Sequence, residues 1–231
     1  MSIFYPYPDI TNDSSNYILC AKTMEIGGYR PVGYSWFINF FHNISESISF
    51  LFFGQYFIHV LCTLFFIFSL KYFIRPAKKM LFYIFALILI LGPHSLYVTN
   101  LIMSESIFNS LTLLFITSAL WFNSSKHAYV NALVIIFHLV VLYFAFNVRY
   151  VALFYPIISL ACFLLFIKNK FLAVILSLLP VFVIINTIDK TTRDMKKHTG
   201  IETFSGFSGW ALANNAVSII PHIDLKPEEI K

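Results

Sequence analysis

The sequence predicts an all-α polytopic membrane protein with about six transmembrane helices and an external interfacial segment before the first. Of the 231 residues, 58% are hydrophobic and only 12% are charged, which is more apolar than a soluble domain can cover with polar surface. Several apolar runs approach the roughly 20 helical residues that cross a hydrocarbon core of about 30 Å. Lys and Arg gather in short loops between alternate runs, as is typical of membrane proteins.

The same charge distribution argues against nucleic acid as a partner. The net charge is +5, but the basic residues form short clusters and no continuous stripe. The three cysteines, Cys20, Cys62 and Cys162, are too far apart for a disulfide framework or a metal knuckle. We therefore expect an integral, multi-pass protein of the inner (plasma) membrane, with membrane lipids as partners, no nucleic acid, no metal and no cofactor.

Residues 1–43 form a polar segment before the first apolar run, and we expect it to be an external loop. Its second half, "GYSWFINFFHNI", is rich in aromatic residues and predicts an interfacial helix in which Tyr34 and Trp36 keep their polar tips in water. The alternative is an ordinary aromatic belt before a span. From the pattern of the opening residues we expect no cleavable signal peptide.

Six apolar runs follow and make up a predicted transmembrane module, residues 44–188. Gly92 and Pro93 interrupt the second run, which predicts a broken or half-spanning helix there. Proline is tolerated inside membrane helices, so Pro156 and Pro180 do not end the later runs. The runs cover residues 47–70, 80–98, 101–122, 128–147, 150–167 and 171–188.

The short loops predict the orientation. Loops 71–79, 123–127 and 167–170 hold seven Lys and Arg, whereas 93–100 and 146–150 hold only Arg149, so the first set is expected in the cytoplasm. Six spans then place residues 1–43 and the tail 189–231 outside. Four basic residues directly after the last span oppose this orientation: Lys190, Arg193, Lys196 and Lys197. Either the charges of the other loops outweigh this evidence, or the four residues are phosphate ligands.

Charged residues beside membrane helices are costly and are therefore candidates for function. On this topology they gather on the outer side, which indicates a reaction centre or a site for a lipid headgroup. Glu105 begins the third run, Arg149 begins the fifth, and His94 ends the second. The opening segment adds four more candidates: Asp9, Asp13, Glu25 and Arg30.

Each candidate also has a purely structural interpretation. Asp13, in "NDSSNY", could cap a helix or form a turn, and with Tyr17 could only begin an amphipathic helix. Glu105 could complement the positive end of a helix, and Arg149 could reach lipid headgroups. Gln55 and His59 lie four residues apart on one helical face, and we expect them to form interhelical hydrogen bonds. His138 is alone in an apolar run.

The order of these features resembles the amino-terminal membrane module of the GT-C class of glycosyltransferases. Within that class it is most similar to the superfamily of dolichyl-phosphate-mannose protein mannosyltransferases and lipid A aminoarabinose transferases. The likeness covers roughly residues 8–188, and "YRPVGYS" is similar to the superfamily's "R-x-P-x-G-Y-P", with Ser35 in place of the final proline. The other matching features are the "D-x-x-x-Y-x-x-x-A" pattern of Asp13, Tyr17 and Ala21, the stretch "GGYRPVGYSWFINFF", Gln55, Pro93, Ser104 with Glu105, and Arg149.

The resemblance implies transfer of a sugar from a polyprenyl-phosphate carrier to a glycan, lipid or protein acceptor outside the cytoplasm. It implies that Asp13 is the catalytic carboxylate that takes the acceptor's proton, and Asp9 is the second choice for that role. Glu105 would orient a donor hydroxyl, a basic partner or a metal, and Arg149, with Arg30 or the lysines after residue 189, would bind the lipid phosphate. Tyr17, Tyr34 and His94 complete the expected substrate site.

Two alternatives stay open beside this interpretation. The family's first helix, its later membrane region and its soluble carboxy-terminal domain have no counterpart, so we expect an incomplete amino-terminal module, which could be inactive. The other alternative is a non-enzymatic polytopic protein, either a transporter component or a lipid-binding scaffold. In a transporter we would expect charges or unwound segments at mid-membrane, at corresponding positions of two halves, and the sequence shows no such pairing.

Overall fold

The structure is a computed structural model. It describes residues 9–24, 30–76, 78–206, 209, 213–215 and 217, without the side chains of residues 94 and 95. The described residues form helices joined by short connections, with a single isolated parallel bridge between Asp9 and Leu101. In chain order the helices are α1 (Asn12–Thr23), α2 (Gly33–Ile44), α3 (Ile48–Ile74), α4 (Lys79–Leu91), α5 (Pro93–Thr99), α6 (Glu105–Leu120), α7 (Ala128–Val148), the 3₁₀ helix η1 (Tyr150–Phe154), α8 (Tyr155–Phe166) and α9 (Lys170–Thr199).

The prediction of an all-helical fold is confirmed for the described residues, and the lengths of its apolar helices are compatible with a membrane protein. Within the described residues, four helices are long and apolar enough to cross a membrane: Ile48–Ile74, Lys79–Thr99, Ala128–Val148 and Lys170–Thr199. Glu105–Leu120 and Tyr150–Phe166 are apolar but shorter. At 1.5 Å per residue, the 16 residues of α6 extend about 24 Å, which is less than a hydrocarbon core of about 30 Å.

The predicted break in the second apolar run is present. α4 ends at Leu91, Gly92 forms the junction, and α5 begins with Pro93 at its first position, where a missing N–H costs no intrahelical bond. At the other end of the chain, α9 continues without interruption from Lys170 to Thr199, past the expected end of the last span at residue 188.

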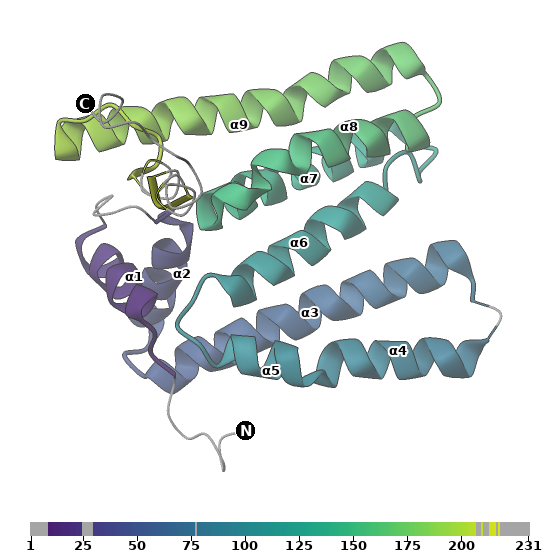
Figure 1. Ribbon diagram of the computed structural model, residues 1–231. Helices are drawn as coiled ribbons and strands as arrows, with labels where there is room; N and C mark the ends of the chain where they lie inside the picture. Colours follow the sequence, from purple (N-terminus) through teal and green to yellow (C-terminus); the bar gives the residue numbers. More distant parts are fainter. Residues whose placement is uncertain are drawn as a thin grey trace.

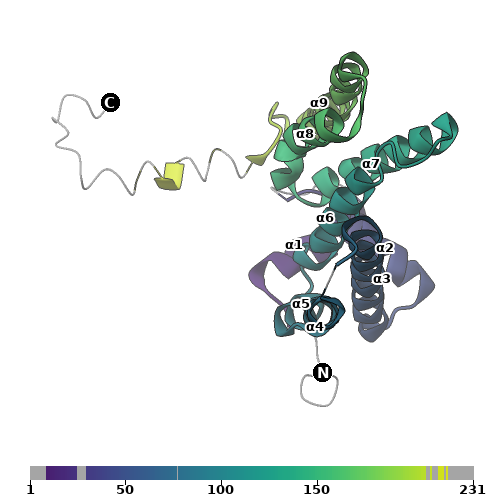
Figure 2. The ribbon, with the colours of Figure 1, turned by 90° about the vertical axis from the view of Figure 1, so that its right-hand side faces the viewer.

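The long helices run up and down between two ends of the molecule. Figure 1 shows α1 and α2 at one end, beside the starts of α3 and α6, with the α3–α4 and α8–α9 connections at the opposite end. Seen from the side in Figure 2, α8 and α9 lie on one side of α6, and α4 and α5 lie on the other. α3 and α6 run in the same direction, since His59 meets Ser110 and, further along both helices, Ser69 meets Trp121 at the end of α6.

Buried polar side chains link the helices inside the bundle. Gln55 of α3 donates to the carbonyls of Thr99 and Leu101 and accepts from the Tyr34 hydroxyl of α2, at 2.8–3.2 Å. The expectation that Gln55 and His59 form interhelical hydrogen bonds is therefore confirmed, the His59–Ser110 contact being the longer at 3.4 Å. A polar group in an apolar medium has no hydrogen bonds to water, and these interhelical bonds take their place.

His138 is not isolated in its apolar helix. Its Nδ1 lies 2.8 Å from Ser118 Oγ of α6, and its Nε2 lies 2.9 Å from Ser159 Oγ of α8. Ser118 donates its own proton to the Phe115 carbonyl, so the imidazole donates from Nδ1 to Ser118 and accepts from Ser159 at Nε2. One neutral histidine thus holds three helices together.

Candidate functional site

A small polar cavity of about 200 Å³ lies at the end of the bundle that carries α1 and α2. Its walls come from α1, from the segment leading into α2, from the start of α6 and from the junction of α7 with η1. The lining residues are Tyr17, Arg30, Pro31, Ser104, Val148, Arg149, Tyr150, Val151 and Ser205.

Two arginine–carboxylate pairs flank this cavity. Arg30 Nη2 lies 2.5 Å from Asp13 Oδ2, and Arg149 Nη1 forms an ion pair with Glu105 Oε1. All four side chains are partly buried, and Arg149 also lies over the Phe108 ring, 5.8 Å from its centroid. Carboxylates from α1 and α6 are thereby brought beside guanidinium groups from two distant loops.

Glu105 keeps an unused acceptor in this arrangement. Its Oε1 contacts Arg149, whereas its Oε2 is buried and has no hydrogen-bond donor among the residues that the structure describes. A buried carboxylate oxygen without a donor is costly, because it has lost water without replacing it. A ligand that brings a hydroxyl or amino group to Oε2 would relieve that cost.

Hydrogen bonds fix α1 against the loop that precedes α6. Ser14 Oγ donates to the Ile102 carbonyl at 2.9 Å, and the Tyr17 hydroxyl donates to Ser104 Oγ at 3.0 Å. The Asp9 backbone pairs with Asn100 and Ile102 in the same loop. Asp13, in the first turn of α1, and Glu105, at the first position of α6, are therefore placed at the same end of the molecule.

The approach of α2 to the end of α7 depends on Gly33. A Cβ atom there would lie 2.6 Å from the carbonyl carbon and oxygen of Asn147 and 2.8 Å from the Val148 nitrogen. Only glycine allows two backbones to come this close. The contact holds Arg30 and Pro31, just before α2, next to Arg149, just after α7.

Tyr17 acts in this site as a hydrogen-bond donor. Burial raises the pKa of its phenol above the ordinary value, while the hydrogen bond to Ser104 and the charge of Arg30 oppose that rise. The hydroxyl keeps its proton at neutral pH and cannot serve as a general base.

Three of the residues predicted for the site line the cavity: Tyr17, Arg30 and Arg149. Asp13 and Glu105 do not line it and are joined to it through their ion pairs with Arg30 and Arg149. Tyr34 does not line the cavity. It is fully buried, with its ring 5.0 Å from that of Tyr17 and its hydroxyl bonded to Gln55, so the expectation that its polar tip stays in water is wrong. Trp36 is half-buried and lines the groove described below.

The remaining predicted residues lie apart from the cavity or outside the described residues. The Asp9 side chain is exposed, and only its backbone reaches the loop before α6. The His94 side chain and Glu25 belong to the parts of the chain that the structure leaves undescribed. The described basic residues that follow position 189 do not line the cavity, and three of them pair with acids near the end of α9: Arg193 with Asp189, Lys196 with Glu202, and Lys197 with Asp194.

Two polar lining residues were missed from the sequence. Tyr150 directly follows Arg149, and the Arg–Tyr pair at the turn after an apolar run is a signal that could have found it. Ser205 comes from beyond α9 and has no such signal, because only the return of α9 to this end of the molecule places it there.

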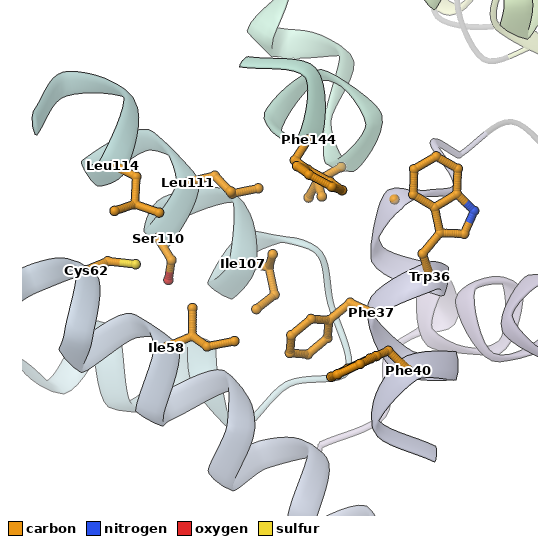
Figure 3. Close-up of a pocket in the computed structure, with 12 residues that line it drawn as sticks. Trp36, Phe37, Phe40, Ile58, Cys62, Ile107, Ser110, Leu111, Leu114 and Phe144 are labelled. Carbon is orange, nitrogen blue, oxygen red and sulfur yellow. The ribbon is translucent and has the colours of Figure 1, made fainter. Parts of the chain in front are cut away.

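An apolar groove of about 340 Å³ adjoins the polar cavity. Figure 3 shows the aromatic side chains of α2 turned toward apolar side chains of α3, α6 and α7. Val148 lines both hollows, and Gly33 lines the groove two residues after Pro31 of the cavity. The groove is lined by Gly33, Trp36, Phe37, Phe40, Ile58, Cys62, Ile107, Ser110, Leu111, Leu114, Phe144 and Val148.

Together, the cavity and the groove suit a ligand with an anionic head and a hydrocarbon chain. Guanidinium groups bind phosphate well, and the aromatic and aliphatic walls have little to offer a polar ligand. Among the described residues no group of three or more His, Cys, Asp or Glu side chains is placed to hold a metal ion. The chain matches no known protein family, no curated protein and no solved structure.

Proposed function

We propose that this protein is a membrane glycosyltransferase that takes a sugar from a polyprenyl-phosphate carrier and transfers it to an acceptor hydroxyl. The observation that carries the proposal is the shared wall at Val148, where a cavity flanked by two arginine–carboxylate pairs meets an apolar groove. A polyprenyl-phosphate sugar has both parts that such a site would bind. The resemblance of the opening segment and of Glu105 and Arg149 to GT-C enzymes supports the same activity.

In the proposed complex, the carrier's phosphate binds Arg149 and Arg30. A guanidinium carries five N–H donors, so Arg149 can hold Glu105 and a phosphate oxygen at the same time. The isoprenoid chain extends from the cavity past Val148 into the groove between α2, α3, α6 and α7. Glu105 Oε2, which has no donor among the described residues, accepts a hydrogen bond from a hydroxyl of the donor sugar.

The transfer step is a direct displacement. The acceptor oxygen forms a bond to the anomeric carbon as the bond from that carbon to the phosphate oxygen breaks. The Asp13 carboxylate takes the acceptor's proton, and the polyprenyl phosphate leaves with the bonding electrons. Arg149 and Arg30 stabilise the negative charge that develops on the leaving phosphate. Tyr17 and Ser104 hold α1, and with it Asp13, against α6.

The proposal includes a topology. In it, α6 and η1–α8 also cross the membrane beside the four long helices, and α2 lies at the outer interface over the cavity. The basic connections between α3 and α4 and between α8 and α9 lie at the opposite end of the molecule, where the positive-inside rule expects the cytoplasm.

A transfer assay on purified protein in nanodiscs tests the chemistry, with radiolabelled polyprenyl-phosphate mannose and polyprenyl-phosphate aminoarabinose as donors. Asp13→Asn and Arg149→Gln are each expected to lower turnover by about 100-fold or more. The matched control is Asp189→Asn, which breaks an arginine ion pair on α9 and should leave turnover unchanged. Equal turnover in all four proteins would refute the catalytic assignment.

A second comparison tests the groove. Leu111→Trp places an indole in it and should raise KM for a long polyprenyl donor while leaving KM for a short, water-soluble prenyl donor unchanged. Leu133→Trp, at an exposed position of α7, is the control. Tight donor binding without transfer in any protein would instead favour a lipid-binding scaffold.

A further inference from the structure

A second pocket lies at the opposite end of the bundle, at the turn between α3 and α4. Its volume is about 260 Å³. Six residues line it: Lys71, Arg75, Pro76, Lys79, Phe82 and Tyr83. Three cations and two aromatic rings therefore surround one hollow, and the proposed transfer reaction uses none of them.

The charge of this pocket is not neutralised within the described part of the chain. No carboxylate there forms an ion pair with Lys71, Arg75 or Lys79. Lys71 Nζ instead contacts Tyr83, 3.2 Å from the hydroxyl oxygen and 5.3 Å from the ring centroid. The polar cavity differs in this respect, because each of its two arginines faces a carboxylate.

A lysine at the neighbouring turn shows the contrast within the same end of the molecule. Lys170, which begins α9, donates to the carbonyls of Leu164 and Ile167 at the end of α8, where a cation also complements the helix dipole. Its charge thus serves the fold. Within the described residues, the side chains of Lys71, Arg75 and Lys79 donate to no backbone carbonyl and line a hollow instead.

The surroundings of the pocket favour a lipid over a free anion. None of the described side chains of α4 is buried, and Met80, Leu81, Ile84 and Phe85 expose their apolar surface directly beside it. α3 and the α4–α5 run are both long and apolar enough to cross a membrane, which places their shared turn near one membrane surface. A lipid whose anionic headgroup is held there would have its hydrocarbon chains along α4.

We propose that the pocket of Lys71, Arg75 and Lys79 binds the phosphate headgroup of an anionic phospholipid, with the acyl chains along the exposed face of α4. The aromatic rings of Phe82 and Tyr83 form the floor on which the glycerol and the first carbons of the chains lie. The site is separate from the proposed transfer site, and its occupancy does not depend on transfer activity.

The backbone of the turn supplies a suitable variant. Arg75 ends α3 in the left-handed conformation, with φ 49°, which glycine adopts more readily than arginine. Arg75→Gly therefore removes the guanidinium while favouring the turn. Lys79→Gln removes a second charge of the pocket without changing the backbone at Arg75. The matched control is Lys168→Gln, at a basic connection that does not line the pocket.

The test measures retained lipid by native mass spectrometry. Each protein is purified from nanodiscs of phosphatidylcholine mixed with phosphatidylglycerol. Each removed pocket charge should lower enrichment of phosphatidylglycerol by about fivefold, as expected for about 1 kcal/mol per basic residue. Lys168→Gln should match the wild type. The thermal unfolding midpoint of Arg75→Gly in phosphatidylcholine alone should equal or exceed that of the wild type.

Three outcomes would overturn the inference. Equal enrichment in wild type and in the Arg75→Gly, Lys79→Gln double variant would show that the pocket is not the site, and an equal loss in Lys168→Gln would show unspecific attraction. A third arm adds inorganic phosphate in excess. Phosphatidylglycerol should stay bound, because its chains contact α4, and complete displacement would identify a free-anion site and refute the lipid assignment.

Discussion

Replacing Gly33 by alanine tests the contact that holds α2 against the end of α7. The new Cβ would lie 2.6 Å from the Asn147 carbonyl, whereas ordinary contact begins at 3.4 Å, so the backbones must separate by about 0.8 Å. No side chain can rotate away to relieve the clash, because the opposing atoms are main chain. Overpacking of this kind costs about 1–3 kcal/mol.

The expected change is a loss of stability with a larger loss of turnover. In a chain of this size, each kcal/mol lowers the unfolding midpoint by about 2–4 °C. Arg30 and Pro31 would move with α2, and a displacement near 1 Å can reduce catalysis by about 100-fold. Thermal unfolding followed by tryptophan fluorescence in nanodiscs gives the first quantity, and the transfer assay gives the second.

The matched control is Gly209→Ala, since a Cβ at residue 209 meets nothing within 4 Å. Its turnover should equal that of the wild type, and its unfolding midpoint should equal or slightly exceed that of the wild type. At an uncrowded helical position alanine is more stable than glycine by up to about 1 kcal/mol, so the clash at Gly33 reverses the usual sign. A midpoint for Gly33→Ala at or above that of the wild type would refute the close contact of α2 with α7.

Three further predictions concern buried polar groups. Gln55→Leu leaves the Tyr34 hydroxyl without its acceptor, which costs about 1–3 kcal/mol. The rate of hydrogen–deuterium exchange in α2 should therefore rise about tenfold. Unchanged exchange would contradict the hydrogen bond between α2 and α3. His138→Leu removes two interhelical hydrogen bonds of about 0.6 kcal/mol each. The unfolding midpoint should therefore fall by a few degrees. An unaltered midpoint would argue against the contact of His138 with both α6 and α8. Burial raises the pKa of Tyr17 above 10.0, so its stabilising contribution is complete below pH 10 and is lost as the pH rises through the folded-state pKa. Circular dichroism should therefore show alkaline unfolding above pH 10, and Tyr17→Phe should move that transition to higher pH.

The amino-acid sequence by itself determined the helical membrane class of this protein. Length and composition of the apolar runs carry that information, since a stretch of about 20 apolar residues has few alternatives to a buried helix. The junction at Gly92 and Pro93 and the interhelical role of Gln55 also followed from local rules. These features depend on residues close together in the chain, so sequence reasoning reached them.

Only the tertiary structure decided how the polar groups pair. Arg30 meets Asp13 across 17 positions and Arg149 meets Glu105 across 44, and no local pattern distinguishes these partners from others of the same charge. Tyr34 turned inward because Gln55, on another helix, offered an acceptor. The cavity, its shared wall with the groove and the basic pocket at the far end arise from helix packing, which places residues distant in sequence within a few ångströms of each other.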